Sequence, residues 1–107
     1  MQLKIVKYSI DDLIVDLKDM SRNLTKLCSE RSLKWEVTGM VQKNDTVILA
    51  LDQCSSLSCD YFFAEINKNS VESIEEEVRS HWQSGLYVMG SVAITEEEHV
   101  GLFRRER

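Results

Sequence analysis

Cysteine and histidine are the residues of this sequence with the clearest potential for metal or nucleophilic chemistry. Cys54 and Cys59 form one loose pair with four residues between them. The other candidates along the chain are Cys28, His81 and His99. A structural zinc site usually takes four ligands, which come as two closely spaced pairs. Because one loose pair is present and the histidines are isolated, the sequence predicts no metal site and no cofactor. A disulfide between Cys54 and Cys59 would require an oxidising environment.

Covalent catalysis would need one of these thiols beside an imidazole, with an orienting carboxylate such as Asp60. The sequence contains no known motif for a catalytic site built from cysteine, histidine and aspartate. The acidic triplets 75–77 and 96–98 are expected in the early turns of a helix and in a hairpin turn, where solvent keeps carboxylates ionised. The four glycines are scattered, so no phosphate-binding loop is present. The sequence therefore predicts no catalytic residues.

Hydrophobic periodicity divides the chain into elements that would have to position these residues. Alternating or continuous apolar runs predict strands, and apolar residues three and four apart predict helices. Ser9 and either Asn69 or Ser70 are candidate N-caps, and Gly85 is a natural helix stop. The predicted strands are 3–8, 34–42, 46–51, 61–66, 86–94 and 99–103, and the predicted helices are 10–28 and 71–82.

The order of these elements is strand-helix-strand-strand, repeated once. Residues 35–41 align with residues 86–92 at an offset of 51, and the second helical region is shorter by about two turns. This pattern predicts an internal duplication with halves 1–53 and 58–107 inside one domain, 1–107. We expect an α+β fold in which two βαββ (split β-α-β) units form a mostly antiparallel sheet with both helices on one face.

One face of this sheet would carry more apolar residues than a solvated sheet normally has. The side chains assigned to the helix-covered face are Trp35, Val37, Val41, Leu86, Val88, Val92, Val100 and Leu102. Strand alternation then places on the opposite face Met40, Ile48, Ala50, Tyr87, Met89, Ala93 and Phe103. Such a face is covered by a second copy of the chain, by a small apolar ligand, or by the chain's own loops and termini. We take these seven residues as a candidate interaction face.

Composition narrows the classes of partner. The chain has 107 residues, of which 43% are hydrophobic, and its net charge is −5. An acidic chain is a poor match for nucleic acid or for an anionic membrane, both of which require a basic surface. The first nine residues lack the apolar stretch of a secretory signal, and three cysteines do not suit a disulfide framework, so a cytoplasmic location is expected.

Three hypotheses for function follow from the sequence. The first is a non-enzymatic interaction protein that forms a homodimer or another homo-oligomer through its sheet face. The second is a small-molecule-binding domain with an apolar ligand. The third is an enzyme that uses Cys59, His81 or His99. No motif in the sequence identifies a biological process or a substrate.

Overall fold

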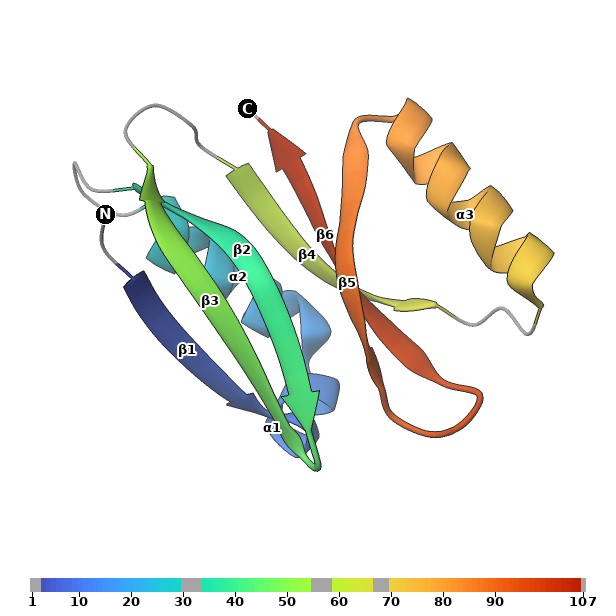
Figure 1. The fold of residues 1–107 in the computed structure, drawn as a ribbon, viewed down its shortest axis with the longest axis horizontal. Helices are drawn as coiled ribbons and strands as arrows, with labels where there is room; N and C mark the ends of the chain where they lie inside the picture. Colours follow the sequence, from blue (N-terminus) through green and yellow to red (C-terminus); the bar gives the residue numbers. More distant parts are fainter. Residues whose placement is uncertain (1–2, 30–33, 55–58, 67–69, 107) are drawn as a thin grey trace.

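The residues that the structure describes form two three-stranded antiparallel sheets and three helices (Figure 1). The computed structural model describes residues 3–29, 34–54, 59–66 and 70–106. Sheet A has the strand order β1-β3-β2, and sheet B has the order β4-β6-β5. Along the chain the elements are β1 (Leu3–Ser9), α1 (Ile10–Val15), α2 (Leu17–Ser29), β2 (Lys34–Lys43), β3 (Thr46–Cys54), β4 (Cys59–Ile66), α3 (Val71–Gln83), β5 (Leu86–Ala93) and β6 (His99–Glu106).

The expectation of one continuous sheet is corrected, because the strands form two separate sheets. Their edge strands β2 and β5 meet through a side chain and not through a backbone ladder. The Gln42 amide donates from Nε2 to the Ala93 carbonyl at 2.9 Å and accepts from the Ala93 N–H at 3.0 Å. Gln42 thus satisfies both backbone groups of Ala93 in place of a neighbouring strand.

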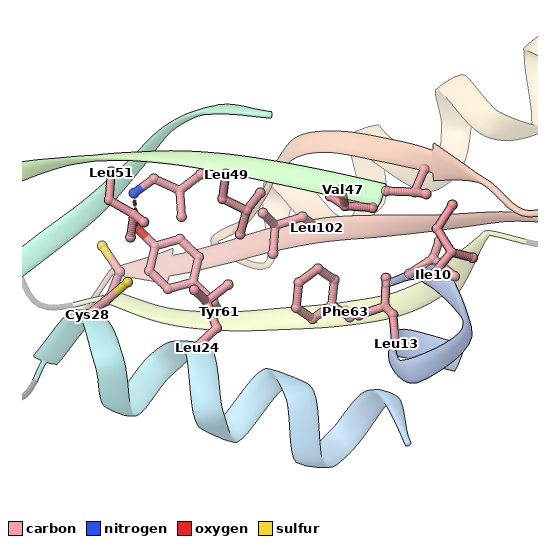
Figure 2. Packing of buried hydrophobic residues seen from close by; sticks show 14 residues of the cluster. Ile10, Leu13, Leu24, Cys28, Val47, Leu49, Leu51, Tyr61, Phe63 and Leu102 are labelled. Atoms are coloured by element: carbon pink, nitrogen blue, oxygen red, sulfur yellow. Dashed lines mark hydrogen bonds between the residues drawn. The ribbon is translucent and has the colours of Figure 1, made fainter. Parts of the chain in front are cut away.

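The hydrophobic core fills the space between the two sheets (Figure 2). Sheet A contributes alternate residues of β3, namely Val47, Leu49 and Leu51, all of which are buried. Sheet B contributes residues from all three of its strands, and the helices close the open side with Leu13 and Leu24. The buried members from sheet B are Cys59, Tyr61, Phe63, Val92, Val100 and Leu102.

Two β-bulges change which residues face this core. The register of β2 against β3 shifts between Val37 and Gly39, and that of β5 against β6 shifts between Val88 and Gly90. A bulge adds one residue and reverses the alternation beyond it. Val41 is therefore 61% exposed although Val37 is buried. Because both were assigned to the same face, the assignment of Val41 to the helix-covered face was wrong.

The predicted helix 10–28 is two helices, α1 and α2, separated at Asp16. The Asp16 backbone is not helical, with φ −152° and ψ 89°, so the helix ends before it. Its carboxylate Oδ1 accepts from the Asp19 N–H at 3.0 Å, which caps the start of α2. Ser9 lies at the N-cap position of α1, but its side chain makes no capping hydrogen bond.

Helix α2 runs along the free edge of β4 and satisfies the backbone of that strand with hydroxyl groups. Ser21 Oγ accepts from the Phe63 N–H at 2.8 Å, and Thr25 Oγ1 accepts from the Tyr61 N–H at 2.8 Å. Four helical residues rise about 6 Å, which matches two strand residues of about 6.6 Å. A hydroxyl on every fourth residue of α2 can therefore meet alternate residues of β4. This pairing protects an edge that would otherwise be open to another strand.

Helix α3 packs on the face of sheet B that points away from sheet A. The His81 ring of α3 lies edge-on to the Phe103 ring with 5.1 Å between ring centroids. Because side chains alternate along a strand and the neighbouring Leu102 points into the core, Phe103 points to the opposite face of sheet B. Ser70 Oγ accepts from the Ser73 N–H at 3.1 Å, which confirms Ser70 as the N-cap. Gly85 has φ +80°, so it ends the helix in a conformation that favours glycine.

Candidate functional site

The seven residues of the predicted interaction face are distributed over two sheets. Phe103 is 2% exposed because α3 covers it. Tyr87 packs edge-on against Trp82 of the same helix, with ring centroids 4.4 Å apart. Met40 and Met89 pack against the core between the sheets. These four residues are therefore engaged in internal packing.

The other three predicted residues lie nearer to solvent. Ala93 is exposed at the edge of β5, where its backbone is paired with the Gln42 side chain. Ile48 and Ala50 are half-buried on β3 and point away from the core, since they alternate with Val47, Leu49 and Leu51. Of the predicted face, Ile48 and Ala50 are thus the members that share an uncovered sheet surface.

We call this surface the open face of sheet A. The open face also includes two apolar residues of β1 and one of β2 that were not predicted, with Leu3 opposite Asp52 at one end. Leu3 is 70% exposed, Ile5 about half, and Val41 61%. Ile5 lies opposite Ala50, and Val41 lies opposite Ile48. In Figure 1, α2 lies behind sheet A and α3 lies beside sheet B, so neither helix covers the open face.

The two ends of the open face differ in charge. Lys7 lies opposite Ile48, and Lys43 lies opposite Thr46, at the end near the β2–β3 turn. Asp52 and Glu36 lie opposite each other at the other end. Glu36 also approaches Arg104 of sheet B at 3.8 Å. Lys34 lies opposite Cys54, beyond this pair of carboxylates on the same face. The open face is therefore an apolar centre between a basic end and an end with two carboxylates and one lysine.

A buried tyrosine connects the two sheets at the far end of the core. The Tyr61 hydroxyl accepts a hydrogen bond from the Val37 N–H at 2.9 Å. Burial raises the pKa of Tyr61 above its ordinary value of 10, and the nearby Cys28 and Cys59 thiols raise it further. Cys28 and Cys59 are themselves buried. This cluster is part of the packed interior and offers no access to a substrate.

The histidines do not lie beside Cys59. Cys59 pairs with Glu106 and Ile66 pairs with His99, so Cys59 and His99 are seven strand positions apart, or roughly 23 Å. His81 packs on the opposite face of sheet B from Tyr61 and Cys59. The Cys54 side chain is not among the described parts of the structure, so the disulfide with Cys59, which would require an oxidising environment, is not tested. Within the described ranges, no three His, Cys, Asp or Glu side chains form a group that could hold a metal ion.

The acidic triplets are mainly exposed, with one exception on α3. Glu77 is partly buried, and its Oε1 lies 3.7 Å from His81 Nε2. In the parts of the chain that the structure describes, its Oε2 has no hydrogen-bond partner. Glu75 instead forms an ion pair with Arg79 at 2.8 Å on the solvent side. Glu77 and His81 line a shallow surface pocket of about 440 Å³ together with Ser73, Glu76 and Ser80, all from α3. Among the described residues no hydrogen bond joins His81 to either serine hydroxyl, so the geometry indicates a structural contact on α3.

Comparison with known proteins adds no relative to this description. No family model matches the chain, and no curated protein or solved structure matches it significantly. Among the described helices, none combines the length and the apolar character that crossing a lipid bilayer requires. The function must therefore be argued from the open face and from the other surfaces of the molecule.

Proposed function

We propose that this protein is a non-enzymatic interaction protein that associates with a second copy of itself through the open face of sheet A. The observation that carries the proposal is the exposure of Leu3, Ile5 and Val41 beside Ile48 and Ala50 on a surface that no described helix covers. Clusters of exposed apolar residues on a soluble domain commonly mark interaction sites.

The arrangement of charge supports a second copy as the partner. A two-fold axis that lies in the plane of the interface and runs across the strands would place the basic end of one copy over the acidic end of the other. Lys7 and Lys43 would then meet Asp52 and Glu36 of the second copy, while the apolar centres meet each other. The open face is thus complementary to itself in polarity and in its Lys7–Asp52 contacts, while Lys34, beside Glu36 on the same face, reduces the attraction of Lys43.

The size of the open face sets the expected strength of association. From Thr46 to Asp52 it is about 20 Å long, and three strands with their side chains are about 15 Å wide, so each copy contributes roughly 300 Å². Stable complexes bury about 800 Å² per partner. The homodimer should therefore be weak and transient, with a dissociation constant on the order of 100 μM.

Sedimentation equilibrium over a range of concentrations around this value tests the proposal. Val41→Lys should abolish dimerisation without unfolding the subunit, because Val41 is largely exposed. Val71→Lys is the matched control, since Val71 is 77% exposed at the start of α3 and far from the open face. If Val71→Lys and Val41→Lys weaken association equally, the open face is not the interface.

A charge exchange tests the two-fold geometry itself. Lys7→Glu should weaken the dimer roughly tenfold, because each Lys7–Asp52 contact occurs twice in a symmetric pair and becomes repulsive. Adding Asp52→Lys to the same chain should restore the wild-type constant, since the exchanged charges attract again. If the double variant dimerises more weakly than Lys7→Glu alone, the proposed arrangement with Lys7 of one copy beside Asp52 of the other is contradicted. A monomeric wild type at millimolar concentration would reject self-association.

The same proposal includes the origin and the location of the chain. Two βαββ halves related by duplication are supported by the matching strand orders and by bulges at residues 38 and 89, which differ by the offset of 51 seen in the sequence. A cytoplasmic location is supported by an odd number of cysteines, two of them buried in the core.

A further inference from the structure

A second surface, unrelated to the open face, is a groove on the outer side of sheet B. One wall is the exposed side of α2, and the floor is the outward face of β4 with the start of β5. Its volume is about 800 Å³. This lies within the range of small-molecule sites, which is roughly 300–1,000 Å³. The groove therefore has the size of a ligand site and not of a packing defect.

The floor of the groove is apolar. Phe62 and Ala64 alternate with the buried Tyr61 and Phe63 along β4, so they point away from the core and into the groove. Leu86 of β5 extends this floor. A ligand that lies here would bury an apolar body against an aromatic ring and aliphatic groups.

The hydroxyl groups along the α2 wall are already used by the fold. Ser21 Oγ donates to the Leu17 carbonyl at 2.6 Å in addition to accepting from β4. Thr25 Oγ1 donates to the Tyr61 carbonyl at 3.2 Å, and Ser29 Oγ donates to the Thr25 carbonyl at 2.7 Å. Because these donors are engaged, polar recognition in the groove depends on the charged side chains of its rim.

That rim is basic in a protein that is acidic overall. Lys18, Arg22 and Lys26 follow each other at four-residue intervals on α2, so they form a row about 12 Å long. Arg105 of β6 lines the groove as well and lies over the Phe62 ring, 5.7 Å from its centroid. Among the described residues of the lining, Asp60 is the one acidic residue, and Arg22 also lies 3.5 Å from Asp19 on α2. Four cations beside an apolar floor, in a chain of net charge −5, make the groove a local site for anions.

We propose that this groove binds a monomeric amphipathic anion, that is, a small molecule with an apolar chain or ring body and a carboxylate or phosphate head. The apolar body lies on Phe62, Ala64 and Leu86, and the head contacts the row of Lys18, Arg22 and Lys26. This site is independent of self-association through the open face, which lies on the other sheet.

Isothermal titration calorimetry with three probes of equal chain length tests the charge preference below their micelle concentrations. Decanoate and decyl phosphate should bind one per chain, and decyltrimethylammonium should bind at least about tenfold more weakly because the rim repels it. Amide chemical shifts should change at residues 62, 64 and 86. Equal binding of the cationic probe would overturn the proposal, because recognition would then be apolar alone.

Charge-neutral variants locate the site. Lys18→Gln, Arg22→Gln and Lys26→Gln together should weaken decanoate binding about tenfold or more, and their exposed positions on α2 leave the core intact. The matched control is Lys34→Gln, Lys43→Gln and Arg79→Gln, which changes net charge equally outside the groove. If both triple variants lose decanoate affinity equally, the effect is due to net charge alone and the proposed site is refuted.

Two further experiments distinguish this small-ligand site from a membrane-binding surface and from a site that depends on the homodimer. Phosphatidylglycerol vesicles test a membrane surface, and binding to vesicles without binding to monomeric decanoate would refute a small-ligand groove. Val41→Lys, which should abolish the homodimer, should leave the decanoate affinity unchanged. Loss of decanoate binding in Val41→Lys would show that the site depends on the open face and would overturn their independence.

Discussion

Replacing Tyr61 with phenylalanine removes one hydroxyl group from the interior and tests how the two sheets are joined. The Tyr61 hydroxyl is the hydrogen-bond acceptor for the Val37 N–H, at 2.9 Å. Val37 lies beside the bulge in β2, and both residues are almost inaccessible to water, with Tyr61 only 1% exposed. In Tyr61→Phe the ring remains, but the Val37 N–H is left buried without this acceptor.

An unsatisfied buried donor costs about 1–3 kcal/mol of folding free energy. The ring keeps its packing against the core, so no large cavity adds to this cost. For a domain of this length each kcal/mol lowers the melting temperature by roughly 4–8 °C. We therefore expect Tyr61→Phe to lower the free energy of unfolding by about 2 kcal/mol without changing the fold.

Urea unfolding followed by circular dichroism measures this loss, and hydrogen exchange at the Val37 amide locates it. Tyr87→Phe is the matched control, because Tyr87 packs on Trp82 and no hydrogen bond of its hydroxyl occurs among the described residues. The control should change stability by less than about 0.5 kcal/mol. If Tyr61→Phe is no less stable than Tyr87→Phe, or if the Val37 amide exchanges as in the wild type, the bridge contributes nothing and the reasoning fails.

Two further predictions concern close packing and alkaline pH. Gly101→Ala should lower the melting temperature clearly, because a Cβ there would lie 2.8 Å from Ile66 Cδ1 and 2.8 Å from the Phe103 ring. The control Gly39→Ala should be close to neutral on packing grounds, since the atom nearest to its Cβ would lie at 3.8 Å. Equal melting temperatures of the two variants would contradict the packing of β6. Burial raises the pKa values of Tyr8 and Tyr61 above 10. Above pH 10 the unfolded chain therefore loses protons that the folded chain retains. The free energy of unfolding should fall as the pH rises through this range. Urea titrations below and above pH 10 should show a smaller fall in Tyr61→Phe than in the wild type, and identical pH dependence would exclude Tyr61 as a source of the effect.

Much of the local structure could be predicted from the sequence because it depends on near neighbours. Ser70 caps α3 through the Ser73 N–H three residues later, and Gly85 ends the same helix with a positive φ. Asn44 takes φ 53° in the predicted β2–β3 turn. Asp16 shows the limit of this approach, since its capping of α2 divides a helix that apolar spacing alone predicts as continuous.

The candidate interaction face was harder to predict because strand alternation fails at a bulge. One extra residue at 38 and one at 89 leave composition and periodicity almost unchanged, yet they reverse the orientation of later residues. Val41, assigned to the covered face, is therefore exposed. Phe103 of β6 keeps its predicted orientation opposite to Leu102, but α3 covers that face and buries it. Ile48 and Ala50 kept their predicted orientation, because β3 has no bulge.

The sequence by itself determined the types and approximate bounds of most elements, the acidic net charge and the absence of a recognisable catalytic motif, because these depend on residue type and local spacing. Tertiary structure alone decided that six strands form two sheets, that Ser21 and Thr25 of α2 satisfy the edge of β4, and that basic residues of α2 and β6 meet beside an apolar floor. These features join residues distant in sequence, and their stability depends on which backbone groups and apolar surfaces remain unsatisfied after the local elements have formed.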